Sequence, residues 1–356
     1  MKRVVITGAG TINALGHNVP QTLEAMREGR CGIGSLDFRD VDRLAIKIGG
    51  QVRDFKADSE FNRQQMSLYD RFTQFTLLAA KEAIGQSGLT FTGDLAATSG
   101  VVLGTAGGGV STWDDNYRAV YEEGKNRVHP FVVPKLMNNA AASHVSMEFN
   151  LKGPSFTVST ACASSNHAMA QAFAMVRSGM STAMITGGSE SMLCFGGVKA
   201  WEGLRVMSKD ACRPFSANRN GMVQGEGAAI FVFEEYEHAR ARGAEVHEMV
   251  VHVARATQPV VRENFRNGRQ MTEAVQAEVP VLKIVAPAVL DLLAPDPGEV
   301  RQRHHLRHAG VLDRHLYISI RFREFGEVRH AFRDVLPQTP VPPNTFDQTR
   351  LVAVHV

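Results

Sequence analysis

The chain has 356 residues, of which 44% are hydrophobic and 21% charged, and its formal net charge is +3. This composition is ordinary for a folded protein, and the length favours one large duplicated domain or two domains. The small net charge indicates neither a nucleic-acid partner nor a membrane-surface partner, and 7% aromatic residues give no stacking platform for single strands. The sequence contains no run of 18 apolar residues, so it predicts no membrane span.

The cysteines indicate a reducing environment. The chain has four of them, and none forms a CxxC pair: Cys31, Cys162, Cys194 and Cys212. Neither a zinc site nor a disulfide framework is therefore predicted, and we expect a cytoplasmic protein. The N-terminal stretch MKRVVITGAG has a short apolar run that glycines soon interrupt, so it predicts a first strand rather than a signal peptide.

The first predicted elements alternate between strand and helix. Residues 3–7 are rich in β-branched side chains and predict a strand that ends in the turn GAG. Helical spacing follows over residues 19–30 and again over residues 68–89, where Gly88 is expected to stop the helix.

The later strands end in glycines. Residues 99–109 predict a strand that runs into a glycine-rich loop, and residues 182–191 predict a strand that runs into Gly-Gly. A polar segment and a helix near residues 134–148 lie between them, and residues 225–244 predict a strand followed by a helix. Alternating strands and helices indicate an α/β fold with a layered sheet.

The composition changes near residue 250. Residues 1–250 contain 28 glycines and 5 prolines, whereas residues 251–356 contain 4 glycines, 9 prolines and one lysine, Lys283. This break predicts a domain boundary between residues 1–250 and 251–356. It also resembles coding sequence that is read in another frame.

Two glycine-rich segments suggest ligand-binding loops. In residues 6–16, ITGAGTINALG, the third glycine of a dinucleotide fingerprint would fall at Asn13, and no acidic residue follows a second strand. A tight strand–helix turn is therefore favoured over a nicotinamide-dependent oxidoreductase, which stays a minor alternative. In residues 104–109, GTAGGG, consecutive amides could hold an anion. Since GK[ST] is missing, close packing or a substrate-channel wall is favoured there.

Cys162 is the strongest candidate for chemistry. It stands between a predicted strand and a predicted helix in FTVSTACASSNHAMAQAFAMV, residues 156–176, among small residues that leave room for a substrate carbonyl. The partial positive charge at a helix N-terminus favours the thiolate, and the Cys162 N–H could donate to an oxyanion. A small buried hydrophobe is the alternative, and the pattern alone leaves both open. We expect the other three cysteines to be structural.

Several segments resemble the β-ketoacyl-acyl-carrier-protein synthases, particularly the elongating type II enzymes and their nodulation protein E-like relatives. They include RVVITGAGTINALG, VSTACASSNHA, ITGGSES and CRPFSANRNGMVQGEGAAIFVFEEYEHARARGA, and they extend to about residue 246. The resemblance implies a thiolase-like α-β-α-β-α sandwich of two similar halves that pairs as a homodimer. The N-terminal half is expected to be intact and the C-terminal half incomplete.

The resemblance also implies the reaction, in fatty acid or related lipid biosynthesis. Cys162 would take an acyl chain from acyl carrier protein as a thioester. Malonyl carrier protein would then lose carbon dioxide, and its carbanion would attack that thioester to give a 3-oxoacyl product. No cofactor and no metal is expected.

Other positions are assigned by the resemblance alone. Gly107 falls where the family places a side chain that gates the acyl pocket, so a glycine would leave the pocket open, and Trp201 would form a pocket wall. Arg205, and more weakly Lys125 and Arg127, would contact the acidic carrier protein. A solvated surface is the alternative for each cation.

The resemblance also predicts segments that this sequence does not contain after residue 250. These are a histidine in an HGTGT-like turn, a lysine and a histidine in a KS..GH..GAAG-like segment, and a GFGG-like loop. His304 and His308 have helical i, i+4 spacing, but flanking arginines disfavour a bound cation, so a solvated basic face is predicted. The chain is therefore expected to be either a condensing enzyme or a catalytically impaired member, such as a frameshifted product or a carrier-protein-binding partner. Retention of Cys162 argues mildly against a partner of the chain-length-factor type.

Overall fold

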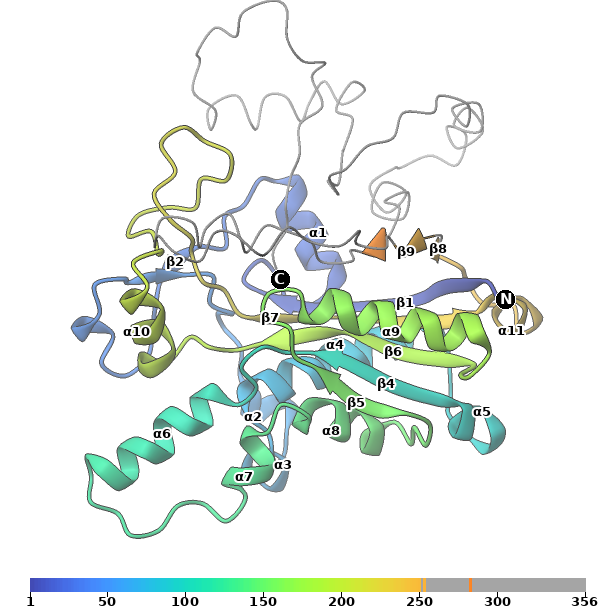
Figure 1. The fold of residues 1–356 in the computed structure, drawn as a ribbon, viewed down its shortest axis with the longest axis horizontal. Coiled ribbons are helices and arrows are strands. Elements are labelled where there is room, and N and C mark those ends of the chain that lie inside the picture. Colours follow the sequence, from blue (N-terminus) through green and yellow to red (C-terminus); the bar gives the residue numbers. More distant parts are fainter. Residues whose placement is uncertain (251, 254–281, 284–356) are drawn as a thin grey trace, which may run out of the picture.

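A six-stranded mixed sheet forms the centre of the molecule (Figure 1). The computed structural model describes residues 1–250, 252–253 and 282–283. The strand order is β5-β4-β6-β7-β1-β8, in which β4 runs parallel to β5 and β6 whereas β7 runs antiparallel to β6 and β1. The strands are β1 (Val4–Asn13), β4 (Ser99–Gly104), β5 (Ser155–Val158), β6 (Ala183–Glu190), β7 (Gly227–Glu235) and β8 (Glu248–Val250). Two short pairs lie outside this sheet: β2 (Gly34–Ser35) with β3 (Ile48–Gly49), and β9 (His252–Val253) with β10 (Leu282–Lys283).

Helices cover both faces of the sheet (Figure 1). α4 (Arg71–Ser87) and α8 (Ala140–Glu148) pack on one face, and α9 (Ser164–Ser178) packs on the other. The remaining helices are α1 (Val19–Arg27), η1 (Val41–Arg43), α2 (Ala57–Glu60), α3 (Arg63–Leu68), α5 (Gly93–Thr98), α6 (Val110–Tyr121), α7 (Val132–Leu136), α10 (Phe195–Gly203) and α11 (Tyr236–Ala241). The α/β prediction is confirmed, and the described residues supply an α-β-α arrangement. The predicted segment 251–356 lies outside the described residues except for 252–253 and 282–283.

Two apolar clusters hold the layers together. Phe72 and Phe75 of α4 are fully buried against the sheet on one side, and Phe173 of α9 packs with Phe233 of β7 on the other. Burial of such side chains contributes about 1.5–3 kcal/mol each. The sheet is therefore a buried layer that can hold the ends of its strands in fixed positions.

The predicted turn at GAG is wrong, because β1 continues through both glycines to Asn13 with a register shift between Ile6 and Gly8. A Cβ atom at Gly8 or at Gly10 would lie 2.0 Å from a backbone oxygen of α4. The glycines therefore let α4 press directly onto the strand. Since they lie inside a covered strand, they form no phosphate-binding turn.

The helix predicted over residues 68–89 is shorter in the structure. α4 begins at Arg71 and ends before Gly88, which has a φ of 67° as predicted for a helix stop. Asp70 caps α4 through the Phe72 N–H and also accepts hydrogen bonds from the N–H and hydroxyl of Thr112. This capping separates α4 from α3 and ties it to the start of α6.

The helix predicted near residues 134–148 is two helices, α7 and α8, and the segment read as polar contains α6. Residues 137–139 separate the two helices. The carbonyl of Leu136, the last residue of α7, accepts a hydrogen bond from the N–H of Gly109. The helical signal in α6 is the four-residue spacing of Trp113, Tyr117 and Tyr121, whose rings contact one another in sequence.

Candidate active site

Cys162 lies exposed on a tight turn between β5 and α9. The turn closes through a hydrogen bond from the Ala163 N–H to the Thr160 carbonyl, 3.2 Å long. Ala161, the residue before the cysteine, has a φ of +52°. A non-glycine residue in this left-handed region costs on the order of 1–3 kcal/mol, so the surrounding structure must hold it there.

Ser164, at the start of α9, holds the turn from inside. Its hydroxyl accepts the Thr160 N–H at 2.8 Å and donates to the Ala161 carbonyl at 2.6 Å, and Ser164 is only 3% exposed. His167, one turn further along α9, places Nδ1 2.7 Å from the Thr160 hydroxyl. These hydrogen bonds thereby hold the backbone on both sides of Cys162.

Glycines at the ends of two strands let the start of α9 pack closely against the sheet. A Cβ at Gly104, the end of β4, would lie 2.2 Å from the Ser164 carbonyl carbon. A Cβ at Gly188 of β6 would lie 2.1 Å from the Ser165 hydroxyl. The N-terminus of α9 therefore rests directly on the ends of two strands, which places Cys162 at the edge where those strands end.

The glycine-rich loop lies beside this turn. The Thr105 N–H donates to the Val158 carbonyl at 3.2 Å, and the Ser159 hydroxyl donates to the Ala106 carbonyl at 3.4 Å. The space beside Gly107 is occupied, because a Cβ there would lie 2.8 Å from Val110 and 3.1 Å from the Met192 sulfur. The side chain of Met192 is flexible, so the contact beside Gly107 is deformable, and the gating role of position 107 stays a prediction.

The other predicted site residues lie further along the surface. Trp201 of α10 is partly buried against an apolar cluster that includes Leu36 and Val198, so its burial has a structural explanation as well. Lys125 and Arg127 are exposed after α6, where the Lys125 ammonium lies 2.7 Å from a Glu123 carboxylate oxygen. The predicted basic face at His304 and His308 lies outside the described residues.

Arg205 directly follows the helix that carries Trp201. It is exposed, its φ is +57°, and its N–H donates to the Glu202 carbonyl. Since α6 and α10 pack against each other, Arg205 and Lys125 belong to neighbouring elements. The contact of Arg205, Lys125 and Arg127 with a carrier protein therefore stays a prediction.

The expectation that the other cysteines are structural does not hold for Cys31 and Cys212, which are exposed. Cys194 is half-buried at the start of α10, and burial raises the pKa of its thiol to about 11. Exposure alone therefore does not distinguish Cys162, whereas its strained turn at the start of a long helix does.

Iodoacetamide is expected to label Cys194 far more slowly than the exposed cysteines at pH 8. A thiol of pKa about 11 is almost fully protonated there, and only the thiolate reacts, so we expect a rate roughly 100-fold lower than that of an ordinary thiol. Peptide mass spectrometry over a time course measures this, with Cys212 as the internal control. Equal labelling of Cys194 and Cys212 would contradict the burial of Cys194.

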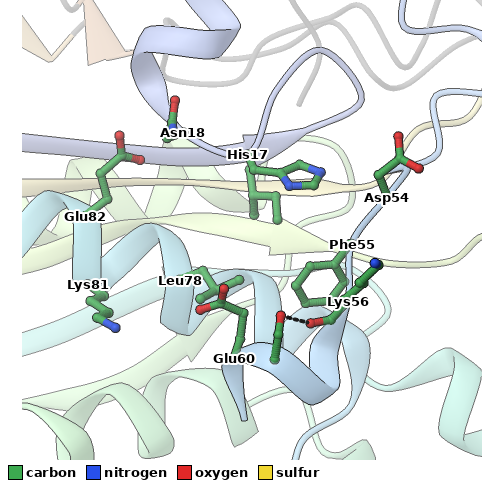
Figure 2. Close-up of a pocket in the computed structure, with 11 residues that line it drawn as sticks. His17, Asn18, Asp54, Phe55, Lys56, Glu60, Leu78, Lys81 and Glu82 are labelled. Atoms are coloured by element: carbon green, nitrogen blue, oxygen red, sulfur yellow. Dashed lines mark hydrogen bonds between the residues drawn. The ribbon is translucent and has the colours of Figure 1, made fainter.

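The pocket drawn in Figure 2 is formed by residues other than those around Cys162. It has a volume of about 490 Å³, and charged side chains of both signs surround it, among them Lys56, Lys81 and Glu82 (Figure 2). None of the predicted site residues lines it.

In the described part of the chain, no group of three or more His, Cys, Asp or Glu side chains is placed to hold a metal ion. No helix among those same residues is both long and apolar enough to cross a membrane.

A family model described as the N-terminal domain of β-ketoacyl synthase matches residues 1–239. The chain belongs to the β-ketoacyl synthase family. It is 42% identical over 245 residues to nodulation protein E of Rhizobium sp. (strain N33). The aligned residues are 69% of this chain and 61% of that protein. It is 34% identical over 255 residues to 3-oxoacyl-[acyl-carrier-protein] synthase 2 of Staphylococcus aureus (strain N315), covering 70% of this chain and 62% of that protein. The match therefore spans less than two thirds of the length of either relative.

Solved structures place this chain in the thiolase-like fold. A β-ketoacyl synthase from Burkholderia phymatum STM815 superposes with a TM-score of 0.63 at 31% identity, covering 73% of this chain and 67% of that one. A ketosynthase from a type II polyketide complex with its acyl carrier protein, AntDE:AntF, gives a TM-score of 0.62 at 25% identity, covering 71% of this chain and 63% of that one. The predicted family and the predicted fold class are both confirmed.

Proposed function

We propose that this β-ketoacyl synthase takes an acyl chain from acyl carrier protein onto Cys162, as the first step of a 3-oxoacyl-acyl-carrier-protein synthase reaction. The observation that carries this proposal is the rigid turn that presents Cys162 at the N-terminus of α9. Relatives at 34–42% identity include an enzyme named for the full reaction, which supports the same assignment.

The turn suits acyl transfer. The Cys162 sulfur attacks the thioester carbonyl, the new C–S bond forms, and the carrier's thiol leaves with the proton. The tetrahedral intermediate carries negative charge on oxygen, and the partial positive end of α9 stabilises charge at that place. In the second step malonyl carrier protein would lose carbon dioxide, and its carbanion would displace the Cys162 sulfur to give a 3-oxoacyl thioester.

The second step is the point at which a catalytically impaired family member becomes the alternative. The family's histidine-bearing segments are not found in the sequence after residue 250. Without donors that stabilise the carbanion, decarboxylation would slow by ~10²–10³-fold for each donor lost. We therefore propose that residues 1–250 act as a ketosynthase domain that captures acyl chains, and that condensation by this chain fails.

Incubation with acyl-loaded carrier protein tests the first step, and the expected result is the acyl mass on the peptide that contains Cys162. Addition of malonyl carrier protein should then give no 3-oxoacyl product, and product at an ordinary rate would refute the impairment.

Sequencing the DNA from codon 240 onward distinguishes a frameshift from a genuine tail. HGTGT-like and GH..GAAG-like segments in a shifted frame would establish the frameshift.

The expected homodimer is also a proposal. In the described part of the chain β5 is an edge strand that pairs only with β4, and Ser155 is exposed. An unpaired strand edge favours addition of another strand. Sedimentation equilibrium should give twice the chain mass, and a monomer at micromolar concentration would exclude this pairing.

Replacement of Arg205 by glutamate is expected to weaken binding of acyl carrier protein about fivefold to tenfold, because a cation that faces an acidic partner becomes an anion. The matched control is Arg240→Glu on α11, which lies at the opposite end of the sheet from α10 (Figure 1). Fluorescence titration at two salt concentrations measures both. Equal affinity for Arg205→Glu and the wild type would remove Arg205 from the carrier-protein site.

A further inference from the structure

Glu190, the last residue of β6, fills the anion-binding turn formed by the glycine-rich loop, residues 105–109. Its carboxylate accepts the Ala106 N–H at 2.7 Å, and the Gly107 N–H lies 3.3 Å from both carboxylate oxygens. The Thr105 hydroxyl donates to it at 3.2 Å. The amides of GTAGGG therefore do hold an anion, and that anion belongs to the chain itself.

Backbone dipoles and a hydroxyl meet the charge of Glu190, since no lysine or arginine in the described ranges forms an ion pair with it. Burial raises the pKa of this carboxyl, although the hydrogen bonds from the loop act in the opposite direction. A folded-state pKa above the ordinary value means that ionisation of Glu190 lowers stability as the pH rises.

The loop that Glu190 holds lies against the segment that leads to the nucleophile. Thr105 is hydrogen-bonded to Val158, and Ala106 is hydrogen-bonded to Ser159. Val158 and Ser159 directly precede the turn of Cys162. Met192, two residues after Glu190, covers the other side of the loop at Gly107. A change at Glu190 would therefore move the loop and its covering side chain together.

We propose that Glu190 is a positioning residue that fixes the loop beside Gly107 and thereby determines which acyl chain lengths Cys162 accepts. This inference rests on the proposed acyl transfer to Cys162. A carboxylate is suited to the role because it only accepts hydrogen bonds, whereas every loop group that faces it donates.

Glu190→Gln is the first variant, because the amide keeps the shape but turns an NH₂ group toward N–H donors. Its matched control is Glu245→Gln, an exposed glutamate whose side chain is 84% accessible. Hydrogen exchange followed by mass spectrometry should show roughly tenfold faster exchange in the 104–110 peptide of Glu190→Gln. Exchange in β7 and the melting temperature should match the wild type, a combination that a merely structural role would not produce.

The second measurement is competition among carrier-protein thioesters with acyl chains of different lengths for Cys162. In Glu190→Gln we expect the ratio of long to short chains on the Cys162 peptide to change about fivefold, with no change in Glu245→Gln. An unchanged ratio, or equal slowing of every chain length, overturns the proposal, as does unchanged exchange in the loop. If the wild type takes up no acyl chain, the proposed function fails, and the role in chain length fails with it. Unchanged loop exchange would defeat the positioning of the loop alone.

Discussion

Replacement of Cys162 by alanine is expected to abolish acyl uptake, with a fall of at least ~10³-fold in the rate of acyl transfer from carrier protein. The sulfur is the atom that forms the new thioester, so its removal leaves no covalent intermediate. Intact mass spectrometry after incubation with acyl-loaded carrier protein measures the effect. The matched control is Cys212→Ala, which removes another exposed thiol.

A second variant separates the turn from the thiol. Ala161→Val keeps Cys162 but places a β-branched residue at a φ of +52°, which such a residue rarely adopts. Acyl uptake should fall at least tenfold while iodoacetamide still labels Cys162. Uptake at the wild-type rate in Cys162→Ala would defeat the assignment of the nucleophile, and an unaffected Ala161→Val would show that the turn geometry is not needed.

Replacement of Arg242 by alanine is expected to lower the free energy of unfolding by about 3–5 kcal/mol, the usual cost of breaking a buried ion pair by removing one of its two charges. The Glu234 side chain is completely buried. It accepts hydrogen bonds from Arg242 Nη2 at 2.7 Å, from Arg242 Nε at 2.8 Å and from the Thr7 hydroxyl at 2.8 Å, and His238 Nδ1 lies 2.6 Å from it. These contacts join β1, β7 and the residues after α11. Urea unfolding followed by circular dichroism measures the loss, and the melting temperature should fall by roughly 10 °C.

The same network predicts a pH dependence. Burial alone would raise the pKa of the Glu234 carboxyl, but hydrogen bonds from Arg242, His238 and Thr7 outweigh it and lower the pKa below its ordinary value of 4.5. A lowered pKa gives stability that is present above the ordinary value and is lost as the pH falls below it. The wild type should therefore lose stability in acid more steeply than Arg242→Ala.

Arg240→Ala is the control for this network, because Arg240 is 69% exposed and, among the described residues, forms an ion pair with the surface residue Glu237 alone. We expect it to change stability by less than about 0.5 kcal/mol. Similar losses for Arg240→Ala and Arg242→Ala would show that the buried pair has no special importance.

The sequence by itself determined the family, the alternation of strands and helices and the position of Cys162. It also determined the end of α4, because Gly88 can adopt a positive φ wherever the rest of the chain lies. These features depend on the identity of neighbouring residues and on periodicity, both of which are local. The identification of Cys162 depended further on the resemblance, since an exposed cysteine alone, such as Cys212, does not indicate a nucleophile.

The tertiary structure decided the features that depend on contact between distant segments. Gly8 and Gly10 predict a turn locally, but the backbone of α4 lies against them, so they belong to a strand. Nothing in the sequence around Glu190 indicates its distant partner, yet it holds a loop 84 residues earlier in the chain. Sequence patterns describe neighbours along the chain, whereas close packing and buried hydrogen bonds form between segments that only the folded sheet brings together.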